Sequence, residues 1–203
     1  MKKIVITLLV LLGLLGCRPS TEYQSQNGDI IFHTSKSSQC LAIQKATKSK
    51  YSHMGIIYLK QGTPFVFEAV GPVKFTPLRD WVARGKGKHY VVKRLANAGE
   101  VITTEAVNRM VEVGELFEDK PYDLYFEWSD DRIYCSELVW KVYKRALNLE
   151  IGELQTMAEF DLSDPLVQKK IRERFGNSVP KEETVISPAA IFASNLWITV
   201  YRE

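Results

Sequence analysis

Hydrophobic and polar residues alternate along this chain with two periods, and the shorter one predicts strands. The segment GDIIFHT (28–34) has β-favouring residues after a glycine and predicts a strand. HMGIIYLKQGTPFVFEAVG (53–71) predicts two strands joined at Gln61-Gly62, because glycine permits the positive φ of a tight hairpin turn. HYVVKRL (89–95) predicts a further strand, and NLWITVYRE (195–203) predicts one that closes the sheet.

Apolar residues three and four positions apart predict helices elsewhere. This spacing occurs in TTEAVNRMVEVGELF (103–117), behind a threonine cap, and in RIYCSELVWKVYKRALNLEIG (132–152). The stretch 161–176 predicts another helix, and SPAAIF (187–192) one with a serine cap and proline in its first position. A short helix is expected within SSQCLAIQKATKSK (37–50), capped by one of its first two serines.

Two segments show neither the strand period nor the helix period. Pro72, Pro77 and the glycines at 85 and 87 break the pattern after the hairpin, and KPYDLYFEWSDDR (120–132) predicts an aromatic-rich loop. The remaining elements combine a mainly antiparallel sheet with packed helices. The pattern therefore predicts an α+β fold.

The N-terminus reads as an export signal. Two lysines precede a run from Ile4 to Leu12 that is apolar apart from one threonine, as in secretory signals. The following LLGC resembles a bacterial lipobox, which implies cleavage after residues 1–16 and lipid on Cys17. An uncleaved anchor is the alternative, although a membrane span needs about 20 apolar residues. Residues 17–27 then form the lipidated cysteine and a polar tether, and 28–203 is long enough for one domain.

Composition narrows the possible partners. The chain has 27 basic and 24 acidic residues, a formal charge of +3 and no long run of one sign. No nucleic-acid footprint, repeat or glycine-rich phosphate loop is present, so no nucleic-acid partner is expected. The cysteines are far apart and no His-x3-His pair occurs, so we expect neither a metal site nor a cofactor.

Cys135 opens a predicted amphipathic helix and can either pack or react. A free cysteine on an apolar face is commonly a small buried hydrophobe. In the first helical turn, however, unpaired N–H groups and the positive dipole end favour the thiolate. If lipid occupies Cys17, Cys40 and Cys135 remain, and a bridge between them is an alternative in an exported protein. Cys40 is otherwise expected to be a buried thiol.

The predicted hairpin supplies partners for that thiol. If Gln61-Gly62 is a two-residue turn, Gly55 lies opposite Glu68, and His53 and Glu68 share one face as diagonal neighbours. A one-residue slip would send them to opposite faces, and Glu68 would then be a solvated strand residue. A thiol at a helix start, an imidazole and a carboxylate that orients it are the parts of an activated nucleophile.

Several motifs resemble a known group of enzymes. KPYDLYFEWSDDRIYCSELVWKVY resembles the nucleophile region of NlpC/P60 cysteine peptidases, where a Pro-Tyr element precedes a Cys-Ser pair that opens a helix. Here YSHMGI and VFEAVG precede the cysteine, an order similar to the circularly permuted branch called YiiX/YebB-like hydrolases. The resemblance spans about residues 28–188. It implies a permuted papain-like fold with Cys135 as nucleophile, His53 as base and Glu68 as the third residue. Tyr122 matches the Pro-Tyr element and is either a substrate-binding or a packing residue.

The resulting expectation is a cysteine hydrolase anchored by lipid in a bacterial cell envelope. The resemblance favours amide bonds, as in cell-wall peptides. Two alternatives stay open. The same three residues serve in acyl transfer or thioester hydrolysis on lipid-derived amides or esters, since permuted members also resemble lecithin:retinol acyltransferase. The second alternative is a non-catalytic envelope lipoprotein that binds a ligand and whose cysteines are bridged.

We predict that Cys17 becomes the lipidated N-terminus. A small residue precedes this cysteine at the end of a short apolar run, as a lipobox requires. Mass spectrometry of membrane-extracted protein should detect an acylated N-terminal Cys17, and Cys17→Ala should change the localisation of the protein. Recovery of the mature protein with Met1 intact would contradict the prediction.

Overall fold

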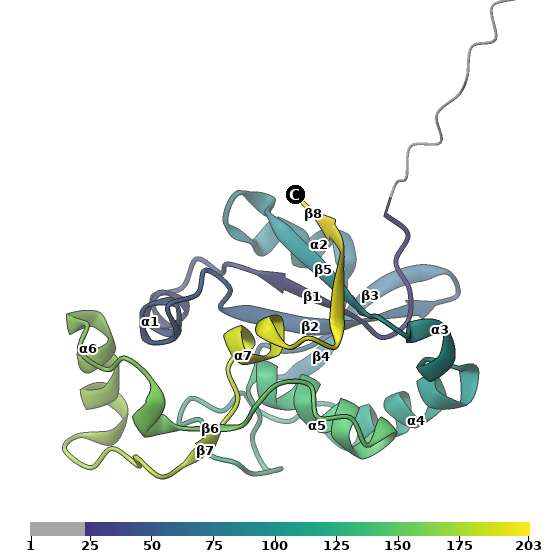
Figure 1. Cartoon of the computed structure of the whole chain (residues 1–203). Coiled ribbons are helices and arrows are strands. Elements are labelled where there is room, and N and C mark those ends of the chain that lie inside the picture. The colour runs from purple at the N-terminus through teal and green to yellow at the C-terminus, as the bar shows by residue number, and fades with distance from the viewer. Residues whose placement is uncertain (1–22) are drawn as a thin grey trace, which may run out of the picture.

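A six-stranded antiparallel sheet forms the centre of the computed structural model, which describes residues 23–203 (Figure 1). The strand order is β4-β3-β2-β1-β5-β8, and β6 and β7 pair separately. The strands are β1 (Asp29–His33), β2 (His53–Lys60), β3 (Thr63–Ala69), β4 (Val73–Pro77), β5 (Tyr90–Leu95), β6 (Gln155–Thr156), β7 (Thr184–Val185) and β8 (Trp197–Arg202).

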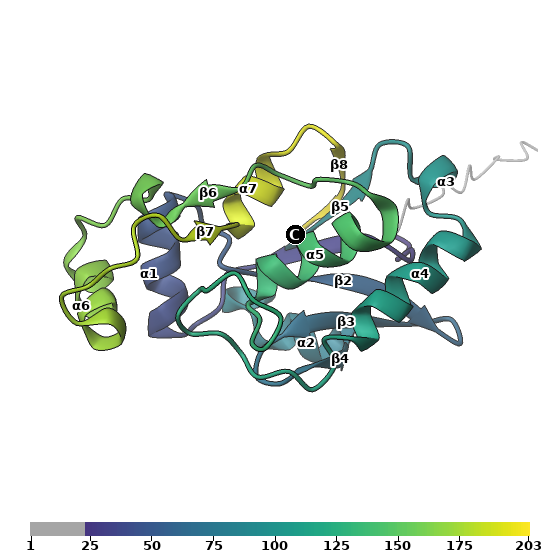
Figure 2. The ribbon, with the colours of Figure 1, turned by 90° about the horizontal axis from the view of Figure 1, so that it is seen from below.

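Helices lie against both faces and one end of this sheet (Figure 2). They are α1 (Ser38–Thr47), α2 (Leu78–Arg84), α3 (Ala98–Val101), α4 (Thr104–Glu115), α5 (Cys135–Leu147), α6 (Pro165–Phe175) and α7 (Pro188–Ala193), with short 3₁₀ turns at Lys86–Lys88 and Met157–Glu159. None of the helices within residues 23–203 is long and apolar enough to cross a bilayer.

The predicted α+β architecture is confirmed, and so is the register of the hairpin. Lys60 pairs with Thr63 across the turn, and Gln61 and Gly62 both have positive φ. The predicted caps are also present. The side chains of Ser37, Thr103 and Ser187 accept backbone N–H bonds at the starts of α1, α4 and α7.

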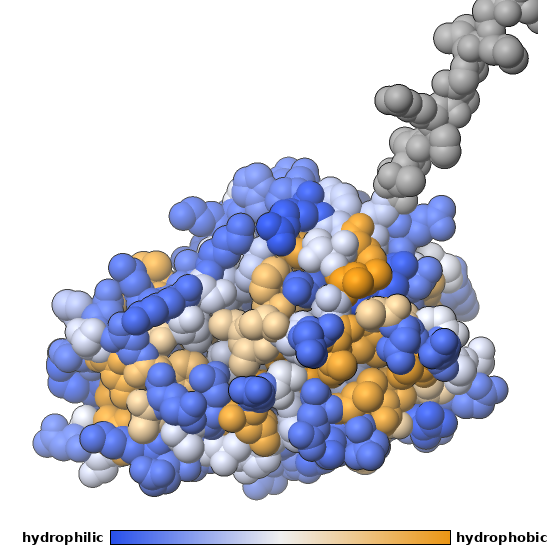
Figure 3. Space-filling model, viewed as in Figure 1, coloured by the Kyte–Doolittle hydropathy of each residue, from blue (hydrophilic) through white to orange (hydrophobic). Residues whose placement is uncertain are grey.

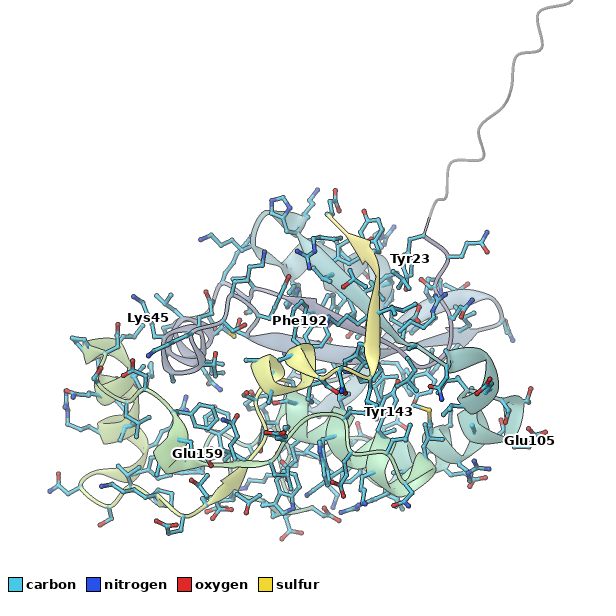
Figure 4. All side chains as sticks on the ribbon, in the orientation of Figure 1. Tyr23, Lys45, Glu105, Tyr143, Glu159 and Phe192 are labelled. Atoms are coloured by element: carbon cyan, nitrogen blue, oxygen red, sulfur yellow. The ribbon has the colours of Figure 1, made fainter. Side chains whose placement is uncertain are left out.

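The larger core lies between the sheet and α5, as the spacing of apolar residues in that helix predicted. Alternate residues of β1 and β2, such as Phe32 and Ile56, meet Leu138 and Val142 of α5. Two labelled side chains in Figure 4 extend this core. Tyr143 packs edge-on against Trp197 at 5.5 Å between ring centroids, and Phe192 of α7 packs on Phe32 at 5.2 Å.

The opposite face of the sheet is covered by α2, an element that the sequence pattern missed. Trp81 is fully buried there against Ile31, Ile57 and Val66. The prolines and glycines after the hairpin indicated only breaks, whereas the chain forms β4 and then α2. Pro77 ends the strand and precedes the first residue of the helix, positions where proline costs little, because neither needs its missing N–H.

The predicted signal segment 1–16 and Cys17 lie outside the described residues and stay predictions. The last part of the predicted tether lies against the domain. Tyr23 donates a hydrogen bond to Asp29 at 2.8 Å, and Arg94 binds both that carboxylate and the carbonyl of Gln24. The polar segment therefore joins the sheet beside β1.

We predict that Gly55→Ala destabilises the protein by about 1–3 kcal/mol. A Cβ at Gly55 would lie 2.5 Å from a methyl group of Val66 and 2.6 Å from the carbonyl oxygen of Phe67, so the hairpin would have to shift. Gly99→Ala is the control, since a Cβ there meets nothing within 4 Å and the residue lies in α3. Urea denaturation should show a lower midpoint for the first variant and no loss for the second. Equal midpoints would refute the close approach at Gly55.

Candidate active site

Cys135 is the first residue of α5, and the residue is 2% exposed. The two residues around it hold this helix end to the segment before α7. Tyr134 accepts a hydrogen bond from the N–H of Ile186 at 3.1 Å, and Ser136 donates one to the carbonyl of the same residue at 2.8 Å. The thiol is thus held at the N-terminal end of a 13-residue helix, where backbone N–H groups lack partners within the helix.

His53 and Glu68 are in direct contact, as the hairpin register predicted. The Nε2 atom of His53 lies 2.6 Å from a carboxylate oxygen of Glu68, and both side chains are buried. His53 begins β2, so its ring lies at the end of the sheet near the start of α5. Because Nε2 faces the carboxylate, the Nδ1 atom is the ring nitrogen that can exchange a proton with Cys135.

Three further donors surround the Glu68 carboxylate. Thr76 of β4 donates a hydrogen bond at 2.6 Å, Trp81 of α2 donates one at 2.9 Å, and Arg84 of α2 forms an ion pair. A fully buried carboxylate needs such compensation, because leaving it unpaired costs several kcal/mol. The elements that sequence reasoning missed therefore supply most of the carboxylate's partners.

These contacts set the charges of the pair. Burial raises the pKa of Glu68, but hydrogen bonds and charges from His53, Thr76 and Arg84 outweigh it and lower the pKa to about 2. Burial lowers the pKa of His53, but hydrogen bonds and charges from Cys135 and Glu68 outweigh it and raise the pKa to about 10. At neutral pH Glu68 is therefore ionised, and His53 can hold a proton beside the sulfur.

His33 is a second histidine at this place. It pairs with His53 across β1 and β2 and stacks on Trp81, with ring centroids 3.9 Å apart. Burial and then the charge of His53 lower the pKa of His33 to about 3, so this ring stays neutral. It packs the back of the site without adding a competing positive charge.

An apolar groove of about 790 Å³, including its open mouth, leads to Cys135 between α1 and α6. Its walls include Ile43, Tyr122, Phe126, Met157, Val167 and Ile171. Figure 3 shows apolar surface gathered over the region of α1 and α6, at the left of the view. A concave, mostly apolar groove with a few polar groups is typical of small-molecule sites.

Tyr122, which the Pro-Tyr motif singled out, lines this groove together with Cys135. Burial raises the pKa of Tyr122 well above its ordinary value, so the phenol keeps its proton. Its oxygen accepts a hydrogen bond from Gln39 of α1 at 3.4 Å. The aromatic loop around it is held by Asp123, which accepts the backbone N–H groups of Tyr125 and Glu127.

Thr76, Trp81, Arg84 and His33 surround the pair but were not expected from the sequence. One signal was present, because a tryptophan and an arginine three positions apart share one face of a helix. Because the helix α2 was not predicted from the sequence, this spacing could not be interpreted as a shared helix face.

Neither cysteine in the described part of the chain is bridged. Cys40 is partly exposed in α1, rather than buried as expected, and its sulfur lies 4.0 Å from the carbonyl oxygen of Ser52. Cys135 is buried as a free thiol. The arrangement thus supplies the three parts of an activated nucleophile at the end of a groove.

The cysteine lies on a helix, whereas the histidine and the carboxylate lie on strands that precede it in the chain. This arrangement defines a permuted papain-like fold. A family model described as "Permuted papain-like amidase enzyme, YaeF/YiiX, C92 family" matches residues 24–201. The chain belongs to this family.

Two relatives from Escherichia coli agree with that assignment. The chain is 48% identical over 195 residues to the uncharacterized protein YiiX of strain K12, covering 96% of this chain and 95% of YiiX. A crystal structure described as the metalloprotein yiiX of Escherichia coli O157:H7 is 51% identical and superposes with a TM-score of 0.85, covering 89% of this chain and 99% of that one.

The description of that relative as a metalloprotein prompts a test of the donor atoms here. Across residues 23–203, no three His, Cys, Asp or Glu side chains lie together in a way that could hold a metal ion. The Glu68 oxygens already accept bonds from four protein donors. The described side chains therefore do not form a metal site by themselves.

We predict that Cys135 reacts with iodoacetamide at about pH 6 and that this reactivity requires His53. The raised pKa of His53, about 10, keeps the imidazolium beside the sulfur through neutral pH and favours the thiolate. His53→Ala should slow labelling at this pH, because the positive ring that favours the thiolate is lost. Peptide mapping measures the labelling of Cys40 separately and so provides an internal control. Equal labelling rates at Cys135 in both proteins would refute the pairing.

Proposed function

We propose that this protein is a lipid-anchored cysteine amidase of the bacterial cell envelope, with Cys135 as nucleophile, His53 as base and acid, and Glu68 as the residue that orients His53. The observation that carries the proposal is the buried His53–Glu68 contact beside the N-terminal cysteine of α5. Membership of an amidase family supports the bond type.

The proposed reaction has two halves. The Cys135 sulfur attacks the amide carbonyl carbon while His53 holds the thiol proton, and the tetrahedral intermediate breaks its C–N bond as His53 protonates the leaving amine. Water then adds to the thioester and gives a proton to His53. Breaking of the C–S bond releases the acid, and the proton returns to sulfur.

Glu68 acts in this scheme by fixing the imidazole. It accepts from Nε2 and so leaves Nδ1 to exchange the proton with sulfur. Its own position is fixed by Thr76, Trp81 and Arg84, so the ring cannot rotate without breaking a buried charged contact.

Backbone N–H groups are the proposed stabilisers of the oxyanion. The N–H of Cys135 lies in the first turn of α5, where the helix provides no acceptor and the dipole is positive. The Tyr122 phenol lines the same groove and keeps its proton, so it is a candidate second donor.

The groove favours substrates with an apolar acyl part. A cell-wall peptide would need polar partners along its backbone, whereas the walls near Cys135 are mostly aliphatic and aromatic. We therefore place lipid-derived amides ahead of cell-wall peptides. A membrane tether through Cys17 would bring the groove to such substrates.

A second candidate function follows from the same groove. An acyl chain held against Cys135 as a thioester can pass to water or to an alcohol, so a thioesterase or lipid acyltransferase uses the same residues. The free thiols of Cys40 and Cys135 support the enzyme over the alternative of a non-catalytic lipoprotein with bridged cysteines.

We predict that the protein hydrolyses N-decanoyl p-nitroanilide and that Cys135→Ala reduces the rate to background. His53→Ala should lower kcat/KM by about a thousandfold, and Glu68→Gln by less, on the order of a hundredfold. The amide of glutamine still accepts a hydrogen bond from imidazole but does not stabilise its positive charge.

Cys40→Ala is the control for the loss of a thiol and should keep wild-type activity. Purified muropeptides offered in parallel test the peptide alternative. Product analysis with a decanoyl thioester and added glycerol separates hydrolysis from transfer. A wild type that cleaves none of these substrates, or a Cys135→Ala variant as active as wild type, would refute the proposed function.

A further inference from the structure

Arg174 of α6 is a cation in the wall of a mostly apolar groove, which Lys170 of the same helix also lines. Its guanidinium lies 5.4 Å from the ring centroid of Phe126. That ring packs edge-on against Tyr134 at 5.2 Å, and Tyr134 directly precedes Cys135. Arg174 and Cys135 line the same groove, with Tyr122 close enough to feel the charges of both. The arginine is therefore linked to the chain segment that carries the thiol through two aromatic rings packed edge to face.

Arg174 also has no anionic partner among residues 23–203, where no hydrogen bond or ion pair involves its side chain. Neighbouring acidic residues are engaged elsewhere. Glu173 binds Lys170 at 2.7 Å, and Asp123 accepts two backbone N–H groups. Arg94, the other partly buried arginine among residues 23–203, is paired with Asp29.

An unpaired, partly buried guanidinium is unfavourable in the free protein. Burial lowers the pKa of Arg174, although an arginine side chain keeps its charge at neutral pH. Desolvating that charge costs free energy that an incoming anion returns. The planar guanidinium matches the two oxygens of a carboxylate or phosphate.

We propose that Arg174 binds an anionic group, a carboxylate or phosphate, of the substrate whose apolar part fills the groove beside Cys135. This inference rests on the proposed function and narrows its substrates to anionic amphiphiles. A neutral acyl amide would occupy the same groove but would leave the guanidinium without a partner. Arg174 is thus a residue that determines specificity, and it takes no part in bond breaking.

Three matched amides test the inference. N-decanoylglycine, N-decanoyl-aminoethyl phosphate and N-decanoylglycinamide share one acyl chain and one amide bond, and differ in carrying a carboxylate, a phosphate or no charge. Binding is measured first by calorimetry on Cys135→Ala, which does not depend on turnover. The charged ligands should bind about tenfold more tightly than the neutral one at low salt, and less so at high salt.

Arg174→Gln should remove this preference and leave binding of the neutral amide unchanged. Arg172→Gln is the matched control, because it removes the same charge from the same helix at an exposed position. It should keep the preference. Arg174→Lys should keep part of it, since an ammonium is a point charge without the fork geometry. Amine release by the otherwise wild-type enzyme should follow the same order in kcat/KM.

The outcomes separate this inference from the proposed function. Equal binding of charged and neutral amides, or equal losses in Arg174→Gln and Arg172→Gln, would overturn the role of Arg174 while cleavage at Cys135 stands. A charge preference that depends on Arg174 but without Cys135-dependent cleavage would support anion binding and refute the amidase. The phosphate and carboxylate arms identify which anion is preferred.

Discussion

The buried carboxylate of Glu68 is the constraint on which the site depends. A negative charge inside a sheet is unfavourable unless several donors surround it, and here they come from β2, β4 and α2. The same contacts join the hairpin to the strand and helix that follow it. One ion thus holds these elements together, fixes the ring of His53 and stays charged because its pKa is about 2.

The thiol reaches this pair from the other side of the sheet. Helix α5 packs across β2 through the main core, and its first turn is held by the backbone of Ile186 between Tyr134 and Ser136. Cys135 therefore comes from a rigid helix and His53 from a rigid strand. Sites built on such elements keep their geometry better than sites on loops.

The groove combines an apolar surface with a positive charge. Aliphatic and aromatic side chains of α1, α6 and the loop around Tyr122 form most of its walls, and one guanidinium without an anionic partner lies among them. Apolar burial supplies affinity without direction, whereas a single charge supplies orientation. Such a groove is suited to an amphiphile whose reactive carbonyl must stop at Cys135.

The hairpin and its register could be predicted from local residues, because glycine at 62 suits a tight turn and a two-residue turn at Gln61-Gly62 pairs Lys60 with Thr63. The contact of His53 with Glu68 follows from that register. Apolar spacing indicated an amphipathic helix with Cys135 near its front, and the permuted order of the motifs indicated the family. These are local properties, set by turns and by neighbours a few residues apart.

The tertiary structure supplied the remaining contacts of the site. It placed Thr76, Trp81 and Arg84 on Glu68, because β4 and α2 are short and leave weak periodic signals between prolines and glycines. It also placed Arg174 beside Phe126, although 48 positions of sequence separate the two. Contacts of this kind arise from how elements pack on one another, and no spacing along the chain encodes them.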